Sequence, residues 1–362
     1  MLFVLSSGYC AYAQSSSNDV YGITLGSMTG QPTPAYEAIP VPESATVHQA
    51  EVTLRVSDIT PNSAVISWSS EVTYITYTLL KFNVFTNTYQ EVLSTTETTV
   101  QLTDLAEDTD YQFALISNNT SLLGETEFTT GVEKAAITVD KVSSSAVELS
   151  LQHSVNTSSL VLYRSTDGEN YTELATLDGD SYTDTDVAEA TTYYYQAKCV
   201  VTRGDKTSES QLSAPVQATT MKSFGLPAVS GATKTYAYYT AVTARSSPQY
   251  KLLRSDACYT DPETGIRMVD GRYCVALGSY YGTKIGTKYR ITLEGGKELE
   301  VILCDQKSDR HTDANHQYAV NNQDILEFYI EKSKLPRGIR GNYGTLPQFS
   351  GAVVAIEQYV ED

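Results

Sequence analysis

The segment "LAEDTDYQF" (Leu105 to Phe113) decides the fold, because a second version of it, "VAEATTYYY" (Val187 to Tyr195), occurs later in the chain. A second pair repeats at nearly the same separation: "SAVISW" ends at Trp68, and "SAVELSL" ends at Leu151. Two signals at almost one period predict two copies of one domain.

Each copy consists of short runs that alternate apolar and polar residues, separated by turn signals, which favours a β-sandwich. In such a fold Trp68 and Leu151 fill the centres of the two sandwiches. Tyr111 and Tyr193 are placed to close a corner by bonding their hydroxyl groups back to the chain. The composition agrees, since 27 tyrosines and one tryptophan occur without any long helical periodicity. We therefore predict an all-β protein.

Both copies resemble fibronectin type III domains. The first matches over residues 49–133, through "TPNSAVISWSS", the "LAEDTDY" corner and "ETEFTTG". The second matches over residues 134–220, with Leu151 where the family usually has tryptophan. Domains of this family are mostly spacers or adhesive modules, so the resemblance implies a supporting role for nearly half of the chain.

The N-terminal segment "MLFVLSSGYCAYAQ" has a short apolar start followed by Ala11-Tyr12-Ala13. This pattern predicts a signal peptide, residues 1–13, although the usual basic start is missing, and a plain N-terminal tail is the alternative. Residues 14–48 are rich in Ser, Gly and Pro and are expected to form a flexible linker. No segment has the ~18 apolar residues of a membrane span. We expect a secreted protein, extracellular or associated with the cell wall.

The net charge of −18 is unevenly distributed. Residues 221–362 contain 17 Lys/Arg and 16 Asp/Glu, whereas residues 1–220 contain 8 and 27. An acidic chain of this kind argues against nucleic acid as a partner. Cys258, Cys274 and Cys304 share the C-terminal region, where either one disulfide or three buried thiols is consistent with the sequence.

Residues 221–362 form a third module with its own strand pattern. Strands are predicted over residues 289–293, 298–303, 325–331 and 351–360, with a tight turn at residues 294–297. This spacing fits a small β-barrel better than another sandwich.

The order "KIGTKYRITL", "KELEVILCD", "ILEFYIE" resembles the double-psi β-barrels of the rare-lipoprotein-A, expansin and three-aspartate (cell-wall lytic) families. The resemblance covers about residues 270–331 and matches Asp305 to the acid that ends the second strand. Glu327 stands where those families have an aspartate in the third strand. This sequence departs from the families' pattern at Gln306 and Lys307, which replace the glycine that usually follows the first acid.

The resemblance implies a carbohydrate cleft with Asp305 as general acid/base and Glu327 in support. In a lytic transglycosylase or glycoside hydrolase acting on peptidoglycan, these two would be the catalytic residues. Tyr280, Tyr281 and Tyr318 would then stack on sugar rings.

The polar stretch "DRHTDANHQY" (Asp309 to Tyr318) allows two other interpretations. His311, Asp313 and His316, with Asp309, could bind a divalent metal, the only cofactor that the sequence raises. Alternatively, the stretch is a solvated loop of a non-catalytic binding module. We expect binding or remodelling of cell-wall glycan, with cell-wall polysaccharide or a surface protein as the partner. An adhesive protein-interaction module is the further alternative.

Overall fold

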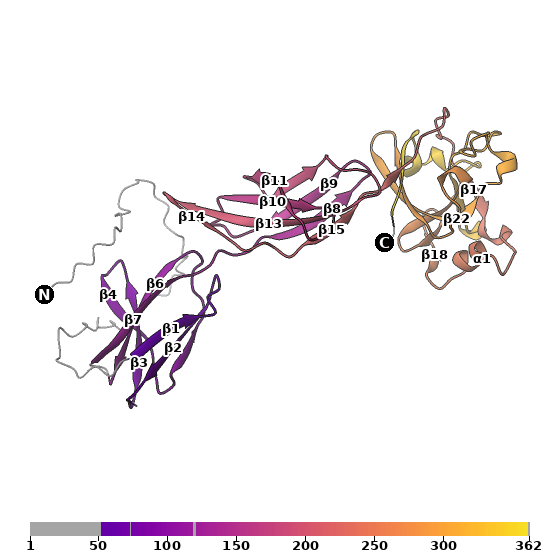
Figure 1. Cartoon of the computed structure of the whole chain (residues 1–362). Coiled ribbons are helices and arrows are strands. Elements are labelled where there is room, and N and C mark those ends of the chain that lie inside the picture. Colours follow the sequence, from indigo (N-terminus) through magenta and orange to yellow (C-terminus); the bar gives the residue numbers. More distant parts are fainter. Residues whose placement is uncertain (1–51, 73, 119–120, 361–362) are drawn as a thin grey trace, which may run out of the picture.

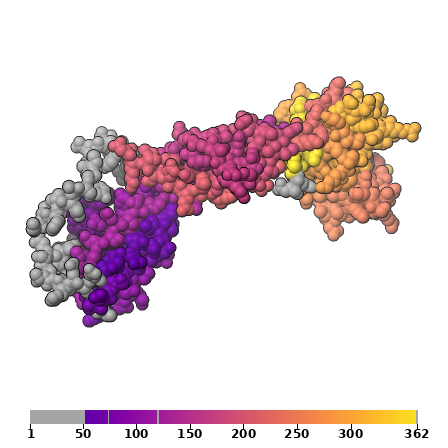
Figure 2. All heavy atoms as spheres, viewed as in Figure 1, coloured from indigo at the N-terminus to yellow at the C-terminus, as the bar shows by residue number. Residues whose placement is uncertain are grey.

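The computed structural model describes residues 52–72, 74–118 and 121–360. The predicted signal peptide (1–13) and linker (14–48) lie outside these residues. The described chain is almost entirely β-structure, so the all-β prediction is confirmed. Two sandwiches and a C-terminal module follow one another along the molecule (Figures 1 and 2). None of the described helices is long and apolar enough to cross a membrane.

The first sandwich pairs a three-stranded sheet with a four-stranded one. Along β2, Ala64, Ile66 and Trp68 are buried at alternate positions, so one face of this strand supplies the core. The strands, in sheet order, are β1 (Val52–Ser57), β2 (Ala64–Ser70) and β5 (Thr99–Leu102), then β4 (Thr88–Thr95), β3 (Tyr77–Asn83), β6 (Asp110–Ser117) and β7 (Ser121–Thr129).

The second sandwich pairs a three-stranded sheet with a five-stranded one. Val147, Leu149 and Leu151 are buried at alternate positions of β9, as their counterparts are in β2. The strands are β12 (Ser181–Asp184), β9 (Val147–Gln152) and β8 (Ala136–Val142), then β11 (Thr172–Leu177), β10 (Ser159–Ser165), β13 (Thr192–Arg203), β14 (Lys206–Glu209) and β15 (Val216–Thr219).

The two sandwiches have the same corner. Tyr111 is 7% exposed, and its hydroxyl oxygen accepts the backbone N–H of Ala106 at 2.8 Å. Tyr193 is 6% exposed, and its hydroxyl oxygen accepts the backbone N–H of Ala188, also at 2.8 Å. The corner that the repeat predicted is therefore built in both copies.

The C-terminal module is a nine-stranded mixed sheet. Strands β17 and β23 are parallel, as are β20 and β22, while the other pairings are antiparallel. Its strands are β16 (Lys222–Ser223), β17 (Thr235–Tyr238), β18 (Cys258–Thr260), β19 (Arg267–Val269), β20 (Arg272–Leu277), β21 (Lys288–Leu293), β22 (Lys297–Gln306), β23 (Glu327–Ile330) and β24 (Val353–Gln358), with one helix, α1 (Pro248–Leu253).

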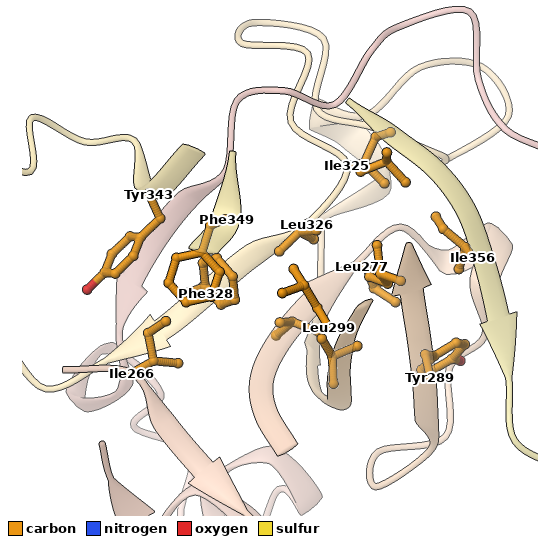
Figure 3. Packing of buried hydrophobic residues seen from close by; sticks show 14 of the residues in the cluster. Ile266, Leu277, Tyr289, Leu299, Ile325, Leu326, Phe328, Tyr343, Phe349 and Ile356 are labelled. Atoms are coloured by element: carbon orange, nitrogen blue, oxygen red, sulfur yellow. The ribbon is translucent and has the colours of Figure 1, made fainter. Parts of the chain in front are cut away.

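Two layers of apolar side chains hold this sheet. Leu277, Leu299 and Phe328 belong to the larger cluster on its concave side, where the side chains point toward one another (Figure 3). The smaller cluster lies on the other side, beneath α1, and contains Leu253 and Tyr329. Because β20, β22 and β23 are covered on both faces, they read as almost continuous apolar runs.

Candidate functional site

A polar cavity of about 650 Å³ opens beside β23 in the C-terminal module. Its wall is made by residues 307–312 of the loop that follows β22, by residues 319–322 and by Thr235 of β17. The polar and charged side chains among its lining residues include those of Lys307, Arg310, His311, Asn321, Asn322, Asp324 and Glu327.

Asp324 lies at the base of this cavity because the chain turns sharply just before β23. Gln323 takes a positive φ of 59°, and its N–H donates to the carbonyl of Ala319 at 2.9 Å. The N–H of Asp324 donates to the side chain of Asn322 at 3.1 Å. These bonds turn the Asp324 carboxyl inward, and none of the residue is exposed.

The two oxygens of Asp324 have different surroundings. Oδ2 lies 3.3 Å from the ammonium of Lys307, whose side chain is 6% exposed, and it accepts hydrogen bonds from the N–H (3.2 Å) and the hydroxyl of Thr235. Oδ1 is buried and has no hydrogen-bond partner within the described part of the chain. Burial raises the pKa of Asp324, and the nearby Lys307 opposes that rise.

Glu327 lines the same cavity and is partly buried. Burial raises the pKa of its carboxyl group, Lys307 opposes the rise, and the negative charges of Asp324 and Asp305 add to it. Glu327 therefore keeps its proton to a higher pH than an ordinary glutamate.

Asp305 lies on the other side of strand β20. Ala276 of β20 is paired with Asp305 of β22 on one side and with Glu327 of β23 on the other, so the two acids are two strand spacings apart. Asp305 accepts a hydrogen bond from the hydroxyl of Tyr329, and the two line a separate cavity of about 310 Å³ beside residues 241–249. Asp305 and Glu327, the predicted catalytic pair, therefore lie on strands on either side of β20, but their side chains line two different cavities.

Asp313, one of the predicted metal ligands, is occupied by hydrogen bonds from the backbone. The carboxylate of Asp313 accepts the N–H groups of Asn315 (3.0 Å), Gln317 (2.6 Å) and Tyr318 (3.0 Å). Burial alone would raise the pKa of Asp313, but these bonds outweigh it and lower the pKa. Asp313 therefore acts as the organiser of a tight turn.

The two histidines of this loop are separated. His316 has a positive φ of 58°, and its Nδ1 lies 3.0 Å from the hydroxyl of Thr312 and 3.7 Å from Asp309. His311 is exposed at the rim of the large cavity. No group of three or more His, Cys, Asp or Glu side chains in the described ranges is arranged to hold a metal ion.

The three predicted sugar-stacking tyrosines occupy different environments. Tyr281 is fully buried, so its ring is not available to a ligand, and burial raises the pKa of its hydroxyl. Tyr318 is partly buried against the larger core cluster. Tyr280 is 44% exposed and packs edge-on against Phe224. None of the three is among the residues that line the large cavity.

The cysteines in the described part of the chain are free thiols. Cys258, Cys274 and Cys304 lie together in the smaller core cluster of the C-terminal module, and Cys199 is buried in the second sandwich. Of the two alternatives left open by the sequence, the structure contains the buried thiols.

Sequence reasoning missed the residues that make the cavity polar at its base. Lys307 was noted only as a departure from a family pattern, and Asp324 and Thr235 were not singled out. The available signal was Lys307 itself, a lysine directly after an apolar strand, which needs a partner if its side chain turns inward. Its partner, Asp324, lies well beyond it in the sequence and is brought close only by the return of the chain to β23.

Comparisons with known proteins bear on the sandwiches. Residues 49–130 match the family model described as "Fibronectin type III domain". A search of curated proteins found no match. Among solved structures, a two-domain fibronectin type III segment of chicken tenascin is 17% identical, with a TM-score of 0.35, and the match covers 46% of this chain and 98% of that one.

A second solved structure, the chicken interferon gamma receptor alpha chain, is 13% identical with a TM-score of 0.35. The match covers 46% of this chain and 96% of that one. At these scores neither structure adds to the argument from the sequence match and the observed strands. On that match, residues 49–130 are a fibronectin type III domain.

Proposed function

We propose that this chain is an exported bacterial protein that binds cell-wall glycan through the C-terminal module, with two fibronectin type III domains as spacers. The second spacer is residues 134–220, and the identical tyrosine corner supports that assignment. The C-terminal module is proposed to be a double-psi-like β-barrel, and its two parallel strand pairs support this.

One observation carries the binding proposal: Oδ1 of Asp324 is buried at the base of a polar cavity without a partner among the described residues. An unsatisfied buried acceptor costs about 1–3 kcal/mol, and a ligand hydroxyl would remove that cost. A volume of about 650 Å³ is within the range typical of small-ligand sites. Lys307, Arg310 and Asn321 supply donors around it.

Charge supports the same assignment. The C-terminal module carries 17 basic and 16 acidic residues, while the preceding residues carry 8 and 27. An anionic wall would repel the acidic spacers more than the nearly neutral module. The module is therefore the part of the chain suited to approach the wall.

The test is a pull-down of the full chain on insoluble peptidoglycan. Arg310→Ala removes one donor at the cavity rim, and Arg245→Ala removes the same charge from an exposed site outside it. We expect several-fold weaker retention for Arg310→Ala and wild-type retention for Arg245→Ala. Equal retention of all three proteins would contradict the proposal, and capture of a surface protein instead would support the adhesive alternative.

Glycan cleavage is a second candidate, favoured by the raised pKa of Glu327. A carboxylic acid whose pKa is raised keeps its proton to a higher pH and can donate it to a leaving oxygen. Because Asp305 lines a different cavity, the catalytic role would fall to Glu327 rather than to the predicted pair. A zymogram with Glu327→Gln beside wild type checks this: clearing by wild type only would establish cleavage.

A further inference from the structure

A glutamate occupies the same position in both tyrosine corners. Glu107 follows Ala106 in the first corner, and Glu189 follows Ala188 in the second, at equivalent places in the two repeats. The adjacent alanine in each case donates its N–H to the corner tyrosine. Each glutamate therefore projects from a backbone that its own domain already fixes.

In each sandwich, a threonine at the end of the domain is hydrogen-bonded to the tyrosine corner of the same domain. The hydroxyl of Thr130 donates to the carbonyl of Ala106 at 2.6 Å and accepts the N–H of Thr109 at 2.9 Å. The hydroxyl of Thr220 donates to the carbonyl of Ala188 at 2.6 Å and accepts the N–H of Thr191 at 2.9 Å. The chain leaves both domains in a fixed direction.

At the first joint, Glu107 reaches into the second sandwich. Its Oε1 accepts the hydroxyl of Ser154 and the side-chain amide of Asn156 (2.9 Å), and its Oε2 accepts the N–H of Glu133 in the connection (2.9 Å). Glu107 is only 9% exposed as a result.

The β13–β14 hairpin of the second sandwich adds two ion pairs to this joint. Arg203 lies 3.5 Å from the carboxylate of Asp108, and Lys206 lies 3.4 Å from that of Asp110. Both acids belong to the corner segment of the first sandwich, and Figure 1 shows β14 extending toward β6. The first corner is thus covered by the module that follows it.

At the second joint, Glu189 performs the equivalent task. Its Oε2 accepts the N–H (2.8 Å) and the hydroxyl (2.7 Å) of Ser223, which lies in β16 of the C-terminal module. From the other side, Arg290 donates to the carbonyl of Val142 at 2.7 Å, and Glu357 accepts the N–H of Ser144 at 2.6 Å.

We propose that each tyrosine corner is a docking surface for the module that follows it, and that Glu107 and Glu189 lock the two joints. Module-to-module motion is the usual expectation for connected domains with small polar interfaces. Here a repeated carboxylate, fixed at its base, receives donors from the next module at both joints. The three modules therefore form one stiff body, independently of which ligand the C-terminal cavity binds.

The experiment measures two distance distributions in the full chain by electron paramagnetic resonance. Spin labels are attached bio-orthogonally at exposed Glu97, Glu173 and Glu263, one in each module. We expect narrow distributions for both pairs in the wild-type protein. Glu107→Ala should broaden the 97–173 distribution to roughly twice its width and leave 173–263 unchanged, and Glu189→Ala should do the reverse.

Glu71→Ala is the matched control, because Glu71 is an exposed glutamate of the first sandwich that follows the end of β2 opposite the tyrosine corner. Unchanged fluorescence of Trp68 verifies that the first sandwich is folded in every variant. Broad wild-type distributions would overturn the proposal, and so would joint variants that behave like Glu71→Ala.

Discussion

Lys234 is a fully buried lysine of the C-terminal module. Its ammonium donates to the carbonyls of Gly231 (3.0 Å), Ala232 (3.4 Å) and Gly351 (2.9 Å). Burial lowers the pKa of Lys234 to about 8, and the charge of Asp324 opposes the decrease. The folded module therefore holds this proton less tightly than the unfolded chain does.

This difference predicts a pH effect on stability. Between pH 8 and pH 10 the unfolded chain keeps the proton of Lys234 and the folded chain loses it, so the contribution of Lys234 to the free energy of unfolding rises with pH, by at most about 1.4 kcal/mol per pH unit. Urea titrations of wild type and Lys234→Met check this. Buried thiols such as Cys304 titrate in both proteins, so the wild-type-minus-variant difference isolates Lys234. A difference that stays constant over this range would contradict the prediction.

The hydroxyl groups of the corner tyrosines should stabilise their domains in addition to the packing of the buried rings. Tyr111→Phe and Tyr193→Phe leave the N–H groups of Ala106 and Ala188 without an acceptor, at an expected cost of about 1–3 kcal/mol each. Hydrogen exchange at these two amides measures the effect. Tyr194→Phe is the control, because its hydroxyl has no hydrogen bond to any described residue; faster exchange in that variant would point to a general loss of packing.

Among the elements, the loop of residues 309–318 is held against the turn that follows β20. A Cβ atom built on Gly278 would lie 1.9 Å from the carbonyl oxygen of His316. The N–H of Tyr280 also points to that oxygen, at 3.4 Å. Only glycine fits this contact, so the loop's position depends on Gly278.

Gly278→Ala is therefore expected to displace the loop and to destabilise the C-terminal module by about 1–3 kcal/mol. Thermal unfolding followed by circular dichroism measures the change. Gly179→Ala serves as the control, since a Cβ there meets no atom within 4 Å. If the two variants melt alike, the loop is free to move away from Gly278.

The strands were largely predictable and the site was not. Alternation in "AVISW" and the turn at Gly295-Gly296 are local signals, and β2 and the β21–β22 hairpin lie where they indicated. The cavity depends on a pairing that no local pattern encodes: parallel β17 and β23 bring Thr235 beside Glu327 and thus close to Asp324. Likewise, the spacing of the acidic and histidine residues after β22 is compatible with a metal site. That spacing does not reveal that the carboxylate of Asp313 already accepts three backbone N–H groups.

At the scale of the molecule, the sole tryptophan of the chain reports on one module only. Trp68 is 5% exposed in the core of the first sandwich, and its ring lies 5.4 Å from that of Tyr77. We predict that Gly278→Ala shifts the circular-dichroism transition of the C-terminal module but not the fluorescence transition of Trp68. A shared shift would mean that the joints also couple the unfolding of all three modules.

The order of strands in the C-terminal sheet has a consequence for synthesis. β16 pairs with β24 and β17 pairs with β23, so the first strands of this module cannot pair until its last strands have been synthesised. Each sandwich, by contrast, is complete once its own short, mostly sequential strands have been made. The sandwiches can fold as they emerge, whereas β20 and β21 each lack one neighbouring strand until β23 and β24 follow. The module with the polar cavity is therefore expected to complete its fold after the two sandwiches.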